Sequence, residues 1–199
     1  MSNHSTPGRR AARLLSERTR SVSPLRPLLV AALLLTLAAC ANSPPIPDGP
    51  REKFELTRDL AGKTVGRGNF NAIDGTDRDF VAYIDGSWDG QVMTLVEDFE
   101  YADGVQETKT WKLTRLPNGE YSGVREDVIG TARGFQDGDA FRLEYTMAIP
   151  DDEGKPGRKV RFRDVLVKQS DGAIRNEAIV GFWGIRVGRV SLIITREEQ

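Results

Sequence analysis

Residues 141–149 read Phe-Arg-Leu-Glu-Tyr-Thr-Met-Ala-Ile, with a large apolar side chain at every second position. Successive side chains of a β-strand point to opposite faces of the sheet, so a period of two indicates a strand. The apolar side chains from Phe141 to Ile149 would then share a buried face, and the residues between them would point away from it. This stretch predicts one half-buried strand of a β-sheet protein.

The same alternation continues on both sides of this strand. Residues 91–101 place apolar side chains on one face, interrupted by Glu97: Met93, Leu95, Phe99 and Tyr101. The last part of the chain repeats the pattern with Val190, Leu192 and Ile194. From Gly62 onward no segment sustains the 3.6-residue apolar period of an amphipathic helix. The domain is therefore predicted to be all-β.

Turn signals separate the predicted strands at intervals of roughly 14–19 residues. Each signal supplies the glycine that tight hairpin turns need for a positive φ: Asp74-Gly75, Asp89-Gly90, Asp103-Gly104, Asn118-Gly119, Asp137-Gly138, Glu153-Gly154 and Asp171-Gly172. Successive hairpins predict an antiparallel meander of about eight to ten strands. Closing the meander into a barrel would remove its exposed edges, although a two-sheet sandwich would give much the same sequence.

A short helix is expected just before the first strand. Phe54, Leu56 and Leu60 would pack onto the domain within a single helical turn over residues 54–61, and Gly62 would end it.

The beginning of the chain has the organisation of a secretory signal. Six arginines and one glutamate precede an uncharged apolar run over residues 28–39, which is too short to span a bilayer. The run ends in Leu37-Ala38-Ala39-Cys40, which resembles the bacterial lipobox. We therefore expect residues 1–39 to be a signal peptide and the Cys40 thiol to receive a diacylglycerol. Ala41 follows in place of the aspartate associated with inner-membrane retention, which favours the outer membrane.

Residues 40–53 are predicted to be a lipidated cysteine followed by a tether. Four prolines and few apolar residues indicate a stiff, extended spacer that holds the domain, residues 54–199, away from the bilayer. Removing six basic and one acidic residue from totals of 28 and 29 leaves 22 and 28, a formal net charge of −6. Such a domain has no electrostatic footprint for nucleic acid.

Several spaced motifs of the domain resemble one known family. They are Asp85-Gly-Ser-Trp-Asp-Gly90, Glu97-Asp-Phe-Glu-Tyr-Ala-Asp-Gly104, Asp127-Val-Ile-Gly-Thr-Ala-Arg-Gly134 and Gly184-Ile-Arg-Val-Gly188. The chain resembles proteobacterial predicted lipoproteins grouped as a domain of unknown function (DUF3833). The resemblance implies a lipocalin-like barrel in the cell envelope and no established activity. Residues 181–184 lack a lysine that the resemblance leads us to expect.

Most standard catalytic groups are missing from the predicted mature chain. The one histidine, His4, lies in the signal, and the one cysteine is the lipidation site. Nucleophile systems that need imidazole or thiol are therefore excluded, as are zinc, copper and iron sites with those ligands. We expect no metal and no cofactor, and the sequence leans away from an enzyme.

Four charged residues are candidates for a polar site inside the barrel. Glu97 interrupts the apolar face of its strand, and Asp164 falls on the same strand face as its apolar neighbours. Arg125 and Asp127, two residues apart, share a face. These groups could anchor a ligand, or they could form a structural ion-pair network that fixes strand register. Acid–base chemistry by two such carboxylates is a remote further reading.

Phe182 and Trp183 are adjacent aromatics between two glycines. Both cannot face one interior, so we expect one of them at a barrel mouth or against a membrane or a partner.

Three functions follow from these expectations. The first is a membrane-anchored, non-enzymatic module that binds a small apolar or lipid-like ligand. The second is a structural lipoprotein whose loops, such as residues 181–188, bind another envelope protein. The third, ranked last, is an enzyme that acts on an envelope lipid or sugar through carboxylate and arginine side chains.

Overall fold

The computed structural model describes residues 43–150 and 156–197. Ten long or medium strands form the domain: β2 (Gly62–Ala72), β3 (Asp77–Trp88), β4 (Val92–Tyr101), β5 (Gln106–Arg115), β6 (Tyr121–Val124), β7 (Ala132–Asp137), β8 (Ala140–Pro150), β9 (Pro156–Gln169), β10 (Ile174–Phe182) and β11 (Ile185–Arg196). A two-residue strand, β1 (Arg51–Glu52), and a four-residue helix, α2 (Leu56–Asp59), precede them. Within the described residues, no helix has the length and apolar character needed to cross a bilayer.

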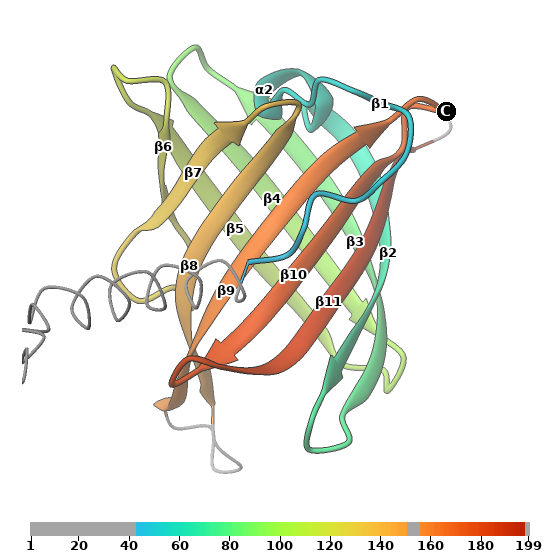
Figure 1. The fold of residues 1–199 in the computed structure, drawn as a ribbon, viewed down its shortest axis with the longest axis vertical. Coiled ribbons are helices and arrows are strands. Elements are labelled where there is room, and N and C mark those ends of the chain that lie inside the picture. The colour runs from blue at the N-terminus through green and yellow to red at the C-terminus, as the bar shows by residue number, and fades with distance from the viewer. Residues whose placement is uncertain (1–42, 151–155, 198–199) are drawn as a thin grey trace, which may run out of the picture. The chain divides into compact units, whose positions relative to one another are not determined.

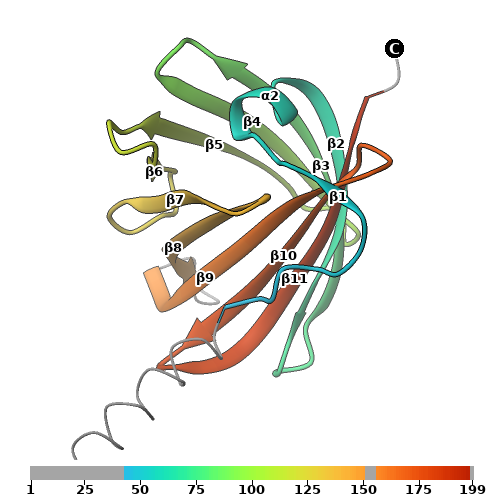
Figure 2. The ribbon, with the colours of Figure 1, turned by 45° about the horizontal axis from the view of Figure 1, so that its top comes forward.

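The strands form a closed antiparallel barrel (Figures 1 and 2). Each strand from β2 to β11 pairs with the next along the chain, and β11 returns to pair with β2 from Gly188↔Ala72 to Arg196↔Thr64. A sandwich would leave two separate sheets, whereas this ring closes on itself. Because β6 and β7 are short, residues 106–111 of β5 and 145–150 of β8 pair with a long strand on one side only. The predicted meander of eight to ten strands, closed as a lipocalin-like barrel, is confirmed.

The predicted turns lie where the glycines indicated. A positive φ is found at the glycine of every predicted turn that the structure describes: Gly75, Gly90, Gly104, Gly119, Gly138 and Gly172. Glu153-Gly154 lies outside the described residues. Two connections had no such signal, namely residues 125–131 and the turn between β10 and β11. In that second turn Trp183 itself takes a φ of 50°.

Helix α2 covers one end of the barrel (Figure 1). Phe54, Leu56 and Leu60 are buried there, as predicted, with exposures of 0%, 4% and 3%. Asp59 stabilises the helix start by accepting a hydrogen bond from the Glu55 N–H at 2.8 Å. The carbonyl of Leu60 lies so close to Gly86 of β3 that a Cβ at this position would be 1.7 Å from it. We call this the closed end, and the opposite end, which carries the β2–β3 and β10–β11 turns, the open end.

The proline-rich segment lies against the barrel wall, and its role as a spacer from the bilayer stays a prediction. Ile46 packs against Ala140, Val165 and Val167 on the outer wall, and Arg142 Nη1 donates a hydrogen bond to the Pro44 carbonyl at 3.0 Å. Further along, β1 pairs with β9. Residues 44–52 are therefore a strap along the barrel wall, because the one apolar side chain among the prolines finds an apolar patch there.

Candidate functional site

A cavity of about 280 Å³ lies inside the barrel. Most of its wall is apolar and comes from inward-facing residues of the strands, with Leu56 and Leu60 closing one end. The alternation predicted for residues 141–149 supplies Phe141, Leu143, Tyr145, Met147 and Ile149 to this wall. The interior is therefore not completely filled by side chains.

Four charged or polar groups meet in this apolar interior. Arg125 lies near the centre of the group, and its Nε donates a hydrogen bond to Asp127 Oδ1 at 2.8 Å. Arg125 Nη1 also donates to Glu97 Oε2 at 3.4 Å. The side chains of Arg125 and Glu97 are only 9% and 14% exposed, and both line the cavity. Asp164 lines the same cavity from β9 and interacts electrostatically with Arg125 and Glu97.

The early end of β6 places Arg125 in the interior. After Val124 the chain leaves the sheet, and the Val128 N–H donates to the Arg125 carbonyl at 3.1 Å to form a turn. The guanidinium carbon then lies 4.7 Å from the centre of the Trp111 ring and 5.6 Å from that of Tyr145. A cation over aromatic faces is stabilised by the ring quadrupoles. These contacts hold Arg125 against the barrel wall.

The buried carboxyl groups have raised pKa values. Burial disfavours the ionised form of Glu97 and raises its pKa to about 7, although Arg125 acts against the shift. Burial likewise raises the pKa of Asp164 to about 8, opposed by Arg125. For Arg125, burial would lower the pKa, but Tyr145, Glu97 and Asp127 raise it overall, so the guanidinium stays charged. The interior therefore holds carboxyl groups that exchange protons near neutral pH beside guanidinium groups that stay charged, Arg125 and Arg78.

Three buried side-chain oxygens have no hydrogen-bond partner among the described residues: Thr64 Oγ1, Asp164 Oδ1 and Asn176 Oδ1. The last two belong to residues on the neighbouring strands β9 and β10 that are each 8% exposed and line the cavity. An unpaired buried acceptor is unfavourable, because it has lost water without gaining a donor. These last two oxygens could accept hydrogen bonds from a bound molecule.

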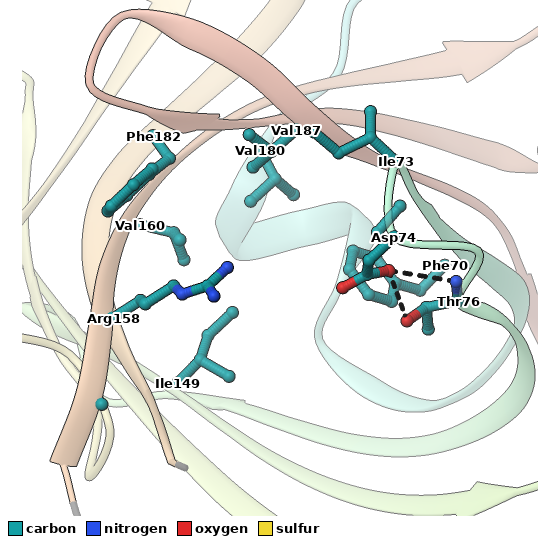
Figure 3. A pocket seen from close by; sticks show the side chains of 12 residues that line it. Phe70, Ile73, Asp74, Thr76, Ile149, Arg158, Val160, Val180, Phe182 and Val187 are labelled. Carbon is teal, nitrogen blue, oxygen red and sulfur yellow. Dashed lines mark hydrogen bonds between the residues drawn. The ribbon is translucent and has the colours of Figure 1, made fainter.

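The open end of the barrel forms a wide mouth of about 620 Å³ (Figure 3). Phe70 and Ile149 line both the mouth and the interior cavity, so the two spaces adjoin. Asp74 and Thr76 lie on one side and Arg158 on the other. Phe182 also lines the mouth, whereas Trp183 is 89% exposed. The two adjacent aromatics therefore point to different surroundings.

The structure thus brings Glu97, Arg125, Asp127 and Asp164 into one cluster, and places Phe182 and Trp183 apart from it at the mouth. The role of these residues in binding stays a prediction. Sequence reasoning missed Asn176, although its alternation with Ile174, Ala178 and Val180 indicates an inward side chain. It also missed Arg78, whose guanidinium carbon lies 3.6 Å from the centre of the Tyr101 ring. Among the residues that the structure describes, no group of three or more His, Cys, Asp or Glu side chains is arranged to hold a metal ion.

Comparison with known proteins identifies the family. The model of the family described as "Protein of unknown function (DUF3833)" matches residues 34–196. The chain belongs to this family. A search of curated proteins finds no match.

Several solved structures match this DUF3833 chain in fold. One of them is the S-type phycobiliprotein lyase CPES from Guillardia theta, with a TM-score of 0.51 and 8% sequence identity. The similarity covers 72% of this chain and 92% of the lyase chain. At this identity the likeness concerns the barrel alone.

Proposed function

We propose that this DUF3833 chain is a membrane-anchored envelope lipoprotein whose barrel binds a small apolar or lipid-like molecule. The observation that carries the proposal is the interior cavity, with its apolar wall, its buried polar cluster and its adjoining open mouth. Ligand sites are typically concave, mostly apolar and provided with a few convergent polar groups. The similarity to a phycobiliprotein lyase contributes only the fold to this proposal.

The anchor rests on the sequence Leu37-Ala38-Ala39-Cys40 after an apolar run with arginines before it. Diacylglycerol at Cys40 together with a further acyl chain would hold the protein stably on a bilayer, since two lipid signals suffice. Ala41 favours the outer membrane. Mass spectrometry of the amino-terminal peptide of the membrane-extracted protein tests this part. An unmodified Cys40 would contradict it.

The polar cluster indicates what kind of polar end the ligand carries. Asn176 Oδ1 needs a donor, Asp164 Oδ1 has no partner, and Arg125 is already engaged by Asp127 and Glu97. A ligand hydroxyl or amine would supply donors, and a hydroxyl could also accept from a protonated Asp164. A ligand carboxylate would bring a negative charge into an apolar site whose two guanidinium groups, Arg125 and Arg78, are already paired with acids. We therefore infer an apolar body with a hydrogen-bond-donating head.

Calorimetric titration with three ten-carbon probes tests this specificity. Decanol and decylamine should bind the domain, and decanoate should bind at least about tenfold more weakly, which is about 1.4 kcal/mol. A bound decylammonium ion beside Glu97 and Asp164 would lower the pKa values of both carboxyl groups. Decylamine binding measured near pH 7 should therefore release protons to the buffer. Equal affinity for all three probes would show that the polar cluster does not select the head group.

A second function is favoured by the exposure of Trp183. Its indole is 89% exposed beside Ile185, which is 66% exposed, in the segment 181–188. Such a patch could bind another envelope protein. Cross-linking in whole cells would then give a discrete partner, and Trp183→Asn, which suits the left-handed backbone, would remove it while the cavity still binds its probes.

A further inference from the structure

Several exposed apolar side chains belong to the open end, and we call them together the rim. Trp183, Ile73 and Ile185 are 89%, 76% and 66% exposed, and Val105 and Ile149 are 45% and 39% exposed. They come from the turns after β2, β4 and β10, from the first residue of β11 and from the last part of β8. In the turns at the closed end, the described residues offer only Leu116 as a large apolar side chain with comparable exposure, at 37%. The two ends of the barrel therefore differ in character.

The backbone at Trp183 is unusual for a residue of this size. Its φ of 50° lies in the left-handed region, which asparagine or glycine occupies with less strain. Its ring contacts Phe182 at 6.3 Å between centroids, yet most of the indole faces outward. Tryptophan is enriched where a membrane meets water, because its ring is apolar and its N–H can stay hydrated. A tryptophan in this position is well suited to a bilayer surface.

The strap directs the proposed anchor toward the same end. In Figure 1 the described part of the strap runs from β1, at the α2 end, down across the outer wall of β9 and β10. Pro44 and Pro45 line a groove of that wall together with residues 175–179 of β10 and Arg186 and Arg189 of β11, so the described strap ends part-way along the wall, on the path from the closed end toward the open end. Cys40 is only three residues before Ser43, the first described residue.

The charges around the rim suit a zwitterionic surface. Arg158 and Arg186 are exposed near it, and Asp74 and Asp103 lie in neighbouring turns. Basic side chains beside apolar ones can bind lipid phosphates. The neighbouring acids offset the positive charge of these arginines, so we expect the rim to bind a zwitterionic bilayer without anionic lipid.

We propose that the open end of the barrel docks onto the bilayer that holds the anchor, with Trp183 in the interfacial layer. The proposal rests on the lipid anchor of the proposed function, and the rim and the strap carry it independently of the interior cluster. The mouth then opens onto the bilayer surface. A lipid-like ligand passes between the membrane and the cavity without crossing bulk water.

Tryptophan quenching by brominated lipid tests the docking. The lipidated full chain is reconstituted in phosphatidylcholine vesicles with and without bromine-labelled acyl chains, next to its Trp183→Phe variant. The difference between the two emission spectra reports Trp183, since Trp88 and Trp111 are common to both. We expect the emission maximum of this difference spectrum to lie at shorter wavelength with vesicles than in buffer without them. We also expect the difference spectrum to lose at least half its intensity when the vesicles contain brominated lipid.

A second tryptophan position is the matched control. Leu116→Trp, placed in the Trp183→Phe chain, puts an exposed indole at the closed end, and we expect it to be unquenched. The docking is overturned if tryptophans at residues 116 and 183 are quenched equally. It is also overturned if Trp183 is not quenched in chains that float with the vesicles. A chain that carries no lipid and does not float overturns the anchor itself, and the docking with it.

Discussion

Glu97 and Asp164 are carboxyl groups that folding transfers into an apolar interior. Their pKa values of about 7 and about 8 mean that the folded chain holds these protons, whereas an unfolded chain releases them near pH 4. Between these limits the folded state binds more protons than the unfolded state. The free energy of unfolding should therefore fall as pH rises from about 4.5 to about 8.

Urea denaturation across this pH range measures the effect. Asp164→Asn should flatten the decline, because asparagine has no proton to lose. Asp103→Asn is the control: Arg78 lowers the pKa of Asp103, so its contribution is present above about pH 4 and is lost only as the pH falls below it. A wild-type stability that is constant or rises between pH 4.5 and 8 would be inconsistent with buried, protonated acids.

Arg125 pairs with both Glu97 and Asp127. Arg125→Met removes the cation beside Glu97 in a poorly hydrated site and leaves Asp127 only Lys109, at 3.7 Å, and we expect a loss of about 3–5 kcal/mol in the free energy of unfolding. Adding Glu97→Gln should recover part of the loss, since it removes the buried carboxyl group that has lost its cation. Chemical denaturation of the single and double variants gives the coupling energy. A loss below about 1 kcal/mol would indicate that water reaches the cluster freely.

The sequence allowed these residues to be found because they break an apolar pattern. Glu97 and Asp164 have the parity of apolar neighbours, so their inward direction follows from the two-residue period of a strand. The position of Arg125 over Trp111 could not be predicted in this way. It depends on β6 ending after four residues and on the turn that follows, and neither has a signal in the local sequence.

At the scale of elements, the closed end depends on a single close approach. Gly86 allows β3 to pass directly beneath the Leu60 carbonyl, where a Cβ would be only 1.7 Å away. Gly86→Ala must displace α2 or β3, and we expect a loss of at least about 2 kcal/mol in the free energy of unfolding.

Gly181→Ala is the matched control for this substitution. The nearest atom to a Cβ at Gly181 is 3.7 Å away, and its φ is not left-handed, so the change should cost less than about 1 kcal/mol. Thermal unfolding of both variants makes the comparison. Similar losses in the two would mean that α2 is not packed tightly on the barrel.

Elements with strong alternation and glycine turns were predictable, and the strap was not. A proline-rich run has no period that could reveal a docking face, and Ile46 is a lone apolar residue within it. Its contact with Ala140, Val165 and Val167 arises only after β8 and β9 are paired, and their outward side chains then form a small apolar patch. Such tertiary contacts have no local signature.

At the scale of the whole molecule, the ring of ten strands is wide enough that inward side chains leave a space of about 280 Å³. The number of strands could be bounded from the turns, but the presence of a cavity could not, because it depends on how far the aromatic side chains reach across the barrel. The central claim is that a small molecule occupies this space.

Native mass spectrometry of the protein purified from a Gram-negative host tests that claim most directly. Ala178 is 2% exposed and lines the cavity, so Ala178→Leu should fill part of the space, whereas Ala148→Leu changes an outward position of β8 and is the control. We predict that the wild type and Ala148→Leu retain a small apolar molecule in addition to the mass of the chain, and that Ala178→Leu does not. A chain without any retained molecule that also fails to take up decanol, or a molecule that stays bound in Ala178→Leu, would contradict a binding site inside the barrel.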